Sequence, residues 1–446
     1  MTDTTPDATI APPVKASFSS GYMRYALALL MVIYTLNILD RQILTILAEP
    51  IKQDLGLADW QLGAITGLAF AVFYTGMGLP IARLADRGDR VWLISASLAI
   101  WSAFTMVCGL AKSFPHLLIA RLGVGFGEAG CSPAAHSLIS EMTPRPKLAS
   151  ALAFYSLGIP LGSLIGLTMG GLVADAFGWR VAFFIAGAPG LLVAVLAVMT
   201  LKEPRRLLRR DERTESTIPL AVAMRELRTK RSFWWISLGT AFGSLVFYSQ
   251  SAFYGSLFMR AHGEEIAALG QSMGLGPAGF LGLALGLLLG LSSGLGTYMG
   301  GQIADRAAKI GIKGYTLVPM IVLLASSPFY MGLNLAPGAI LALACVVPAS
   351  FAFALAYGPI FASVQSLVSP GVRATASAVH LFVTTVIGLG LGPLVVGLLS
   401  DVFAVAHGPA AGLQYAMACS TLGLFIAGGC FYLAGRSIGQ DEYKGA

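Results

Sequence analysis

The chain has 446 residues, of which 56% are hydrophobic and 11% are charged, and it carries a formal net charge of +7. Soluble globular domains contain about 25% charged residues, so this composition excludes a single soluble globule. It predicts an all-helical integral membrane protein, because a chain this apolar needs lipid as the solvent of its outer surface.

Twelve apolar stretches are long enough to cross a bilayer as helices, which needs about 20 residues each. In chain order they are 23–47, 61–84, 91–111, 115–140, 148–175, 181–201, 232–259, 277–303, 315–335, 339–368, 374–402 and 411–435. Residues 1–20 contain two aspartates and three prolines, which does not suit a signal peptide. We expect 1–20 and 437–446 to be cytoplasmic tails, the first of them disordered.

The basic residues are distributed unevenly between the predicted loops. With both ends placed in the cytoplasm, 23 of the 29 Lys and Arg residues fall on the inner side and four on the outer side. Arg41 and Arg121 make up the difference and lie within predicted spans. This bias predicts a multi-pass protein of a bacterial inner membrane with both termini cytoplasmic. The net positive charge is then a topology signal, and we expect no binding of nucleic acid.

The first half of the sequence recurs in the second half. Asp86-Arg87 follows the second predicted span, and Asp305-Arg306 follows the eighth, 219 residues later. The fifth and eleventh spans share five positions at an offset of 226, namely Lys147, Gly162, Gly166, Gly171 and Asp175 with Arg373, Gly388, Gly392, Gly397 and Asp401. The chain therefore divides into two six-span bundles, 21–201 and 232–436, joined by a cytoplasmic linker, 202–231.

The linker contains ten basic and five acidic residues. The spacing of apolar residues over 218–227 suits either a short amphipathic helix on the inner leaflet or a solvated segment. The five cysteines of the chain all lie in apolar spans, at spacings that fit neither a zinc site nor a disulfide framework. No metal site is therefore predicted.

Four charged residues interrupt two of the predicted spans. Asp40 and Arg41 lie in the first span, shortly after Asn37, and Arg121 and Glu128 lie in the fourth. A charge at bilayer depth costs roughly 2.5–3.5 kcal/mol on insertion scales, and such residues usually mark a path for substrate or protons. Arg121 and Glu128 are seven residues apart and share one helix face.

These five residues form the predicted substrate-binding and proton-coupling site. An arginine stays charged and offers a fork that suits phosphate or carboxylate, so Arg41 is the expected anchor for an anionic headgroup. A buried carboxylate beside an arginine can change protonation as its surroundings change. Glu128 is therefore the expected main proton site, coupled to Arg41 and Asp40 and tuned by Arg121. The alternative is a permanent salt-bridge clamp that fixes helix packing.

The second half holds few charges at depth and offers polar and aromatic side chains instead. The candidates for its side of a cavity are Tyr248, Gln250, Tyr254, Tyr298, Tyr357, Gln365 and Thr384. This asymmetry suits an amphipathic substrate, with its charged head against the first bundle and its apolar tail against the second. Ordinary hydrogen bonding between helices explains any single one of these residues equally well.

Two six-span repeats, with an Ala-Asp-Arg loop after the second span and a copy after the eighth, resemble the major facilitator superfamily. Within it, the segments 37–41, 59–63 and 121–128 resemble those of the spinster-type lipid transporters. The resemblance implies that spans 1 and 4 line a central cavity reached by alternating access. It also implies a cytoplasmic gate, whose expected residues are Asp86, Arg87, Arg90, Asp305 and Arg306.

The expected function is secondary active transport, driven by protons, of a lysophospholipid or sphingoid-phosphate type of lipid. A proton-coupled symporter of a small organic anion, such as a sugar acid or phosphate ester, is the alternative within transport, and a passive lipid scramblase is another. An enzyme is not expected, because its best candidate, His136 near Ser132 and Ser137, matches no catalytic motif. No nucleotide-binding loop is present. We expect no cofactor besides the coupling proton, and a monomer, the default for the superfamily.

Overall fold

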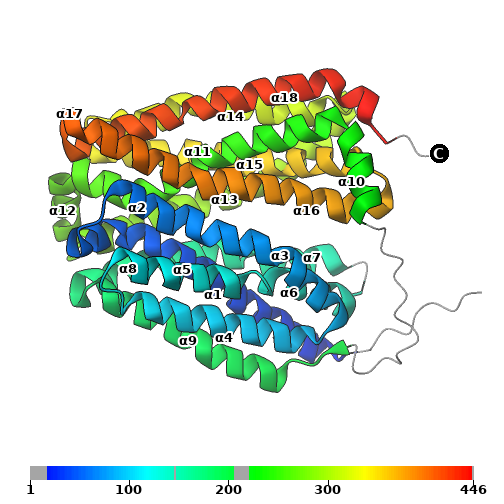
Figure 1. Ribbon diagram of the computed structural model, residues 1–446, viewed down its shortest axis with the longest axis horizontal. Helices are drawn as coiled ribbons and strands as arrows, with labels where there is room; N and C mark the ends of the chain where they lie inside the picture. Colours follow the sequence, from blue (N-terminus) through cyan, green and yellow to red (C-terminus); the bar gives the residue numbers. More distant parts are fainter. Residues whose placement is uncertain (1–17, 145–146, 205–219, 444–446) are drawn as a thin grey trace, which may run out of the picture.

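The computed structural model describes residues 18–144, 147–204 and 220–443, and over these ranges the chain is helical, with no strand. The helices form two bundles that lie side by side in Figure 1, where the first half runs from blue to green and the second half from green to red. The predicted fold class is confirmed. The start of the first helix and the end of the last helix lie at the same end of the molecule (Figure 1).

Each bundle consists of six spanning segments, several of which are broken into shorter helices. Those of the first bundle are α1 (Ser20–Leu55), α2 (Asp59–Gly63) with η1 (Ala64–Leu68) and α3 (Ala69–Arg87), α4 (Arg90–Cys108), α5 (Phe114–Glu128) with α6 (Cys131–Met142), α7 (Leu148–Ser156) with α8 (Gly158–Phe177), and α9 (Trp179–Thr200). Those of the second are α11 (Arg231–Ala261), α13 (Pro277–Ile310), α14 (Gly314–Leu335), α15 (Ala339–Ser366), then η5 (Pro370–Val372), α16 (Arg373–Thr384), η6 (Thr385–Leu391) and α17 (Gly392–Ser420), and finally α18 (Leu422–Asp441).

The last two spanning segments meet within α17. Gly408 has φ 80° and ψ 166°, which divides this helix at a sharp turn, so the eleventh segment ends there and the twelfth continues into α18. Because non-glycine residues avoid this region of backbone space, the turn depends on the missing side chain. The turn falls in the gap predicted between spans 374–402 and 411–435.

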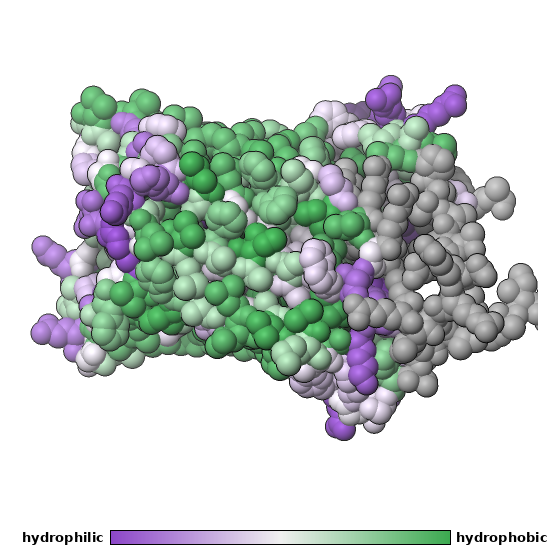
Figure 2. All heavy atoms as spheres, turned by 60° about the horizontal axis from the view of Figure 1, so that its bottom comes forward, coloured by the Kyte–Doolittle hydropathy of each residue, from purple (hydrophilic) through white to green (hydrophobic). Residues whose placement is uncertain are grey.

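On the face shown in Figure 2, hydrophobic residues form a band across the middle, and hydrophilic residues gather towards the two ends. Eight helical stretches of the described residues are each long and apolar enough to cross a membrane, and the last of them, Arg373–Asp441, has 69 residues. About 20 residues cross a bilayer, so this stretch provides two spans.

Two short helices lie outside the spanning segments. The amphipathic α10 (Leu220–Thr229) falls close to the helix considered over 218–227, and it crosses the ends of the spanning helices in Figure 1. The helix α12 (Gly263–Ser272) occupies a region predicted to be a loop. Its first turn holds Glu264 and Glu265, which suit the positive end of a helix, and it buries Ile266.

The two bundles meet along two equivalent seams, α8 against α13 and α17 against α2. A Cβ added to Gly63 of α2 would lie 2.2 Å from the carbonyl oxygen of Pro393 in α17. A Cβ added to Gly282 of α13 would lie 2.1 Å from the carbonyl oxygen of Leu167 in α8. Gly282 follows Gly63 by 219 residues, the repeat offset, so the same close approach of backbones is built twice.

Each seam ends in an aspartate that caps a helix of the opposite bundle. Asp401 of α17 accepts hydrogen bonds of 2.9 Å from the backbone amides of the first two residues of α2. Asp175 of α8 accepts bonds of 3.3 and 2.6 Å from the amides of Ala278 and Gly279, at the start of α13. A carboxylate at a helix N-terminus is favourable because the free N–H groups and the helix dipole both attract it.

Candidate functional site

Arg41 of α1 forms an ion pair with Glu128 at the end of α5. The Nε and one terminal nitrogen of Arg41 lie 2.8 and 2.6 Å from the same oxygen, Oε2. The Glu128 side chain is fully buried, whereas 28% of the Arg41 side chain is exposed. The other carboxylate oxygen, Oε1, is buried and has no hydrogen-bond partner among the described residues. The arginine is therefore the accessible member of the pair.

A second ion pair lies beside the first and is buried on both sides. The Nη1 of Arg121 in α5 lies 3.1 Å from Oδ2 of Asp40 in α1, and the two side chains are 2% and 3% exposed. Thr105 of α4 forms a short hydrogen bond to the other oxygen of Asp40. The four intramembrane charges thus lie together as two pairs, and three helices supply the polar groups around them.

These pairings refine the predicted arrangement. Arg121 was expected to tune Glu128, but its direct partner is Asp40, and Glu128 pairs with Arg41 instead. Asn37, one turn before Arg41 on α1, is 1% exposed, and neither polar atom of its side chain has a partner among the described residues. Sequence separation could not fix the pairing, because it depends on the rotation of α1 against α5.

Aromatic rings surround the guanidinium of Arg41. Its carbon atom lies 4.5 Å from the centre of the Phe70 ring and 4.9 Å from that of Tyr74, both in α3. From the second bundle, Tyr248 of α11 interacts electrostatically with Arg41 and lies close to Tyr357 of α15. Aromatic faces attract a cation, so both bundles contribute to the surroundings of this arginine.

Other second-bundle candidates do not share this position. Gln250 is fully buried, and its Nε2 donates to the Met417 carbonyl at 2.9 Å, so it holds α11 to α17 within the bundle. Tyr254 is also fully buried in the core. Neither side chain is exposed in this conformation, so their place in a cavity stays a prediction. Tyr298 is 69% exposed, and Gln365 is exposed as well.

Thr384 is buried on α16 and donates to the carbonyl of Leu381 at 3.0 Å in the preceding turn. This bond satisfies its hydroxyl within the helix. The hydroxyl thus gives no sign of a role beyond local hydrogen bonding.

The expected cytoplasmic gate is described only in part. The side chains of Asp86 and Arg87 lie outside the described residues, and Asp305 and Arg306 of α13 are exposed. Arg90 is fully buried inside the first bundle, where it pairs with Glu203, and with Glu141 at 2.5 Å. In this conformation Arg90 of α4 contacts α6 and the segment that follows α9, and it does not reach the second bundle.

A cluster that the sequence analysis missed joins the bundles at the opposite end. Arg260, at the end of α11, donates two hydrogen bonds of 2.8 Å to Asp59 of α2 and one of 2.8 Å to Glu49 of α1. Asp59 also accepts bonds from Lys52 at 2.5 Å and from Ser400 of α17 at 2.7 Å. The sequence does show charged residues at the ends of these spans. It does not show that they pair, because Arg260 and Asp59 lie in different halves of the chain.

The Asp59 carboxylate stays ionised over a wide pH range. Burial by itself would raise the pKa of Asp59, but hydrogen bonds from Arg260, Lys52 and Ser400 outweigh it and lower the pKa to about 2. Because four charged groups and a hydroxyl meet across the seam, this end of the molecule is held closed.

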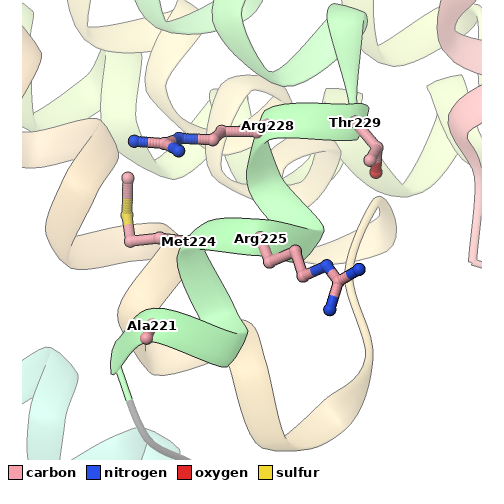
Figure 3. Close-up of a pocket in the computed structure, with 5 residues that line it drawn as sticks. All are labelled: Ala221, Met224, Arg225, Arg228 and Thr229. Carbon is pink, nitrogen blue, oxygen red and sulfur yellow. The ribbon is translucent and has the colours of Figure 1, made fainter.

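The helix α10 borders a hollow of about 550 Å³ at the other end of the molecule, lined by Ala221, Met224, Arg225, Arg228 and Thr229 (Figure 3). Met224 and Arg228 point to one side of the helix and Arg225 and Thr229 to the other. Glu226 ties α10 to the second bundle, because it accepts hydrogen bonds of 2.8 and 3.0 Å from Ser369. This hollow lies apart from the intramembrane charges.

The family model of the Major Facilitator Superfamily matches residues 30–393, which cover most of the first bundle and much of the second and include all four intramembrane charges. The chain belongs to the Major Facilitator Superfamily. It is therefore a multi-pass membrane transporter with the fold of an alternating-access carrier, and not an enzyme. The enzyme candidate His136 packs edge-on against Tyr155, with ring centres 5.3 Å apart.

Two solved structures are similar to this transporter over nearly its whole length. Both are of a bacterial homologue of the human lysosomal transporter spinster, in inward-facing occupied and unoccupied conformations. Each is 31% identical and covers 96% of this chain and 100% of that one, with TM-scores of 0.81 and 0.83. The transporter is thus spinster-like in sequence and in structure, as its resemblance implied.

Two curated relatives differ in the activity that their names record. An MFS-type efflux pump of Mycolicibacterium smegmatis is 35% identical over 84% of each chain. A hexuronate transporter of Bacillus subtilis is 32% identical over 38% of this chain and 40% of its own length. The relatives therefore agree on the family and differ in what they carry.

Proposed function

We propose that the protein is a proton-coupled transporter of an amphipathic anion of the lysophospholipid or sphingoid-phosphate type. The observation that carries this proposal is the ion pair between a partly exposed Arg41 and a fully buried Glu128. We place the end that bears both termini in the cytoplasm of a bacterial inner membrane.

The ion pair links anion binding to proton binding. An anionic headgroup that takes the guanidinium of Arg41 leaves Glu128 as a buried carboxylate with weakened pairing. An unpaired buried charge is costly, and a carboxylate avoids that cost by taking up a proton. Substrate and proton would therefore bind together, which is the requirement of a symporter, and each would strengthen the binding of the other.

The surroundings of Arg41 favour a substrate with an apolar part. Phe70 and Tyr74 of the first bundle, and Tyr248 and Tyr357 of the second, present rings near the expected headgroup site. Ligand sites for amphipathic molecules combine such apolar walls with a few placed polar groups. The likeness to a spinster homologue over 96% of the chain agrees with the resemblance to spinster-type lipid transporters noted in the sequence.

A small organic anion is the second candidate substrate. The partial similarity to a hexuronate transporter favours it, and Arg41 would hold a sugar carboxylate as readily as a phosphate. In that case the aromatic rings would pack against a sugar ring in place of an acyl chain.

Transport in liposomes containing the purified protein tests the proposal. A fluorescent lysophospholipid and radiolabelled glucuronate are offered separately, under proton gradients of either sign, to wild type, Glu128→Gln and Asp54→Asn. Asp54 is a half-exposed carboxylate of the same bundle. It pairs with Arg180 and with none of the four intramembrane charges, so Asp54→Asn is the matched control.

We expect gradient-driven accumulation of the lysolipid by wild type and by Asp54→Asn, and its loss in Glu128→Gln. Accumulation of glucuronate alone would refute the lipid as the substrate and favour the small organic anion. Lipid movement that ignores the gradient would refute proton coupling and leave a passive scramblase. Full gradient dependence in Glu128→Gln would remove Glu128 from the mechanism.

A further inference from the structure

Thr105 of α4 is a polar neighbour of Asp40 that the charges alone do not reveal. Its hydroxyl oxygen lies within hydrogen-bond distance of two atoms, Oδ1 of Asp40 and, at 2.9 Å, the carbonyl oxygen of Trp101 one turn earlier on the same helix. Thr105 is 1% exposed and Asp40 is 2% exposed. The Thr105 hydroxyl thus connects the Asp40 carboxyl group to the Trp101 carbonyl within the first bundle.

A hydroxyl group has one proton, so it donates only one of these two bonds. If Asp40 is ionised, the hydroxyl of Thr105 donates to the carboxylate, and the Trp101 carbonyl keeps only its bond within the helix. If Asp40 is protonated, its own O–H donates to the oxygen of Thr105, and Thr105 turns its proton to the Trp101 carbonyl. Both protonation states of the buried carboxyl therefore find a partner without movement of any heavy atom.

The charged and titratable groups that face Asp40 come from two helices. Arg121 of α5 holds its other oxygen, Oδ2, and Glu128 of the same helix interacts with it electrostatically at longer range. Cys108 of α4 interacts with both Asp40 and Arg121. Asp40 therefore has a cation at one carboxylate oxygen, the hydroxyl of Thr105 at the other, and a second carboxylate at longer range.

We propose that Thr105 is a positioning residue for proton transfer, whose hydroxyl reverses its hydrogen bond as Asp40 gains or loses a proton. In the reversal the incoming proton bonds to Oδ1 of Asp40, and the proton of Thr105 stays on its own oxygen while it rotates from Asp40 to the Trp101 carbonyl. This inference rests on the proposed proton coupling, and it names the group that keeps Asp40 hydrogen-bonded in both states.

The test compares Thr105→Val, which has the same shape without the hydroxyl, with Thr105→Ser, which keeps the hydroxyl. The ionised state loses a charge-assisted bond in Thr105→Val, and the protonated state loses a weaker neutral one. We expect the midpoint of the pH profile of transport to rise by about one pH unit in Thr105→Val, a roughly tenfold gain in proton affinity. Thr105→Ser should keep the wild-type midpoint.

Thr240→Val is the matched control. Thr240 of α11 is also buried and donates to the carbonyl one turn earlier, Ile236, at 2.8 Å, but it touches no carboxylate. It should leave the midpoint unchanged. A wild-type midpoint in Thr105→Val, or an equal shift in Thr240→Val, would overturn the proposal.

An infrared titration of the purified protein decides the question where Thr105→Val transports too slowly to measure. The band of a protonated carboxyl that disappears in Asp40→Asn belongs to Asp40, and its midpoint should follow the same order among the three threonine variants. An identical titration of this band in wild type and Thr105→Val would refute the role of Thr105. Absence of gradient-driven transport by wild type would instead refute the proposed coupling, while the infrared result stands by itself.

Discussion

Replacing Asp59 by asparagine should open the end of the molecule at which α2 meets α11. Asp59 and Arg260 are 1% and 8% exposed in their side chains and share two hydrogen bonds of 2.8 Å. The asparagine oxygen still accepts one bond, and Arg260 keeps Glu49 at 2.7 Å. The closed form then loses one charge-assisted hydrogen bond, which contributes about 1.5–3 kcal/mol to its stability. Because the bond crosses the seam, the ratio of open to closed molecules should rise roughly tenfold to hundredfold.

Distances between spin labels on the two bundles measure this ratio. Lys112, in the loop after α4, and Met273, after α12, are both exposed near the closed end and accept the labels once the five native cysteines are replaced. Asp59→Asn should add a population with longer distances. Asp54→Asn is the control, because Asp54 pairs with Arg180 at 2.5 Å within one bundle and both are more than 40% exposed.

The pH dependence of the same measurement has a definite sign. The pKa of Asp59 in the closed form is about 2, below the roughly 3.9 of a solvated aspartate. The stabilising contribution of the carboxylate is therefore complete above the solvated value and is lost only as the pH falls through about 2. Wild type should give the same distances at mildly acidic and neutral pH. Unchanged distances in Asp59→Asn, or opening of wild type at mildly acidic pH, would refute the reasoning.

Three further substitutions test other parts of the structure. Arg41→Lys should raise the KM for substrate at least about tenfold, because lysine lacks the planar fork and its stacking; uptake kinetics would show it, and an unchanged KM would exclude Arg41 as the anchor. Glu203→Ala should destabilise the protein by about 3 kcal/mol, since it leaves the buried Arg90 short of a partner; a melting curve in detergent matching wild type would contradict this. Gly282→Ala should disrupt the seam, because its Cβ would lie 2.1 Å from a backbone oxygen, whereas Gly290→Ala, with a contact at 3.5 Å, should be tolerated; equal melting temperatures of the two variants would count against the seam.

The sequence predicts the bundle and its charged centre because both are local signals. Apolar runs of sufficient length identify the spans, and charges within two of them identify Asp40, Arg41, Arg121 and Glu128. The pairing between these residues is not local, since it depends on how α1 turns against α5. The role of Thr105 is also invisible in the sequence, because threonine is common in spanning helices and only the contact with Asp40 distinguishes it.

The cluster around Arg260 shows a second limit of sequence reasoning. Arg260 and Asp59 are separated by 201 residues and belong to different bundles, so their contact exists only through the docking of one bundle against the other. Gln250 illustrates a different limit. A polar residue in an apolar span suggests a cavity, but in this structure the Nε2 of Gln250 donates to the carbonyl of Met417 on a neighbouring helix of the same bundle.

The paired caps formed by Asp175 and Asp401 have the symmetry of a homodimer, in which one surface binds a copy of itself. In a true homodimer every substitution appears in both arms of such an interface. A fused chain escapes this constraint, and the seams show the result: Asp59 carries a carboxylate that binds Arg260, while its counterpart 219 residues later is Ala278. The seam between α2 and α17 thus has an ion pair to Arg260 beside its helix cap, whereas the position equivalent to Asp59 in the seam between α8 and α13 has no charge. Two seams built from the same repeat can therefore differ in strength.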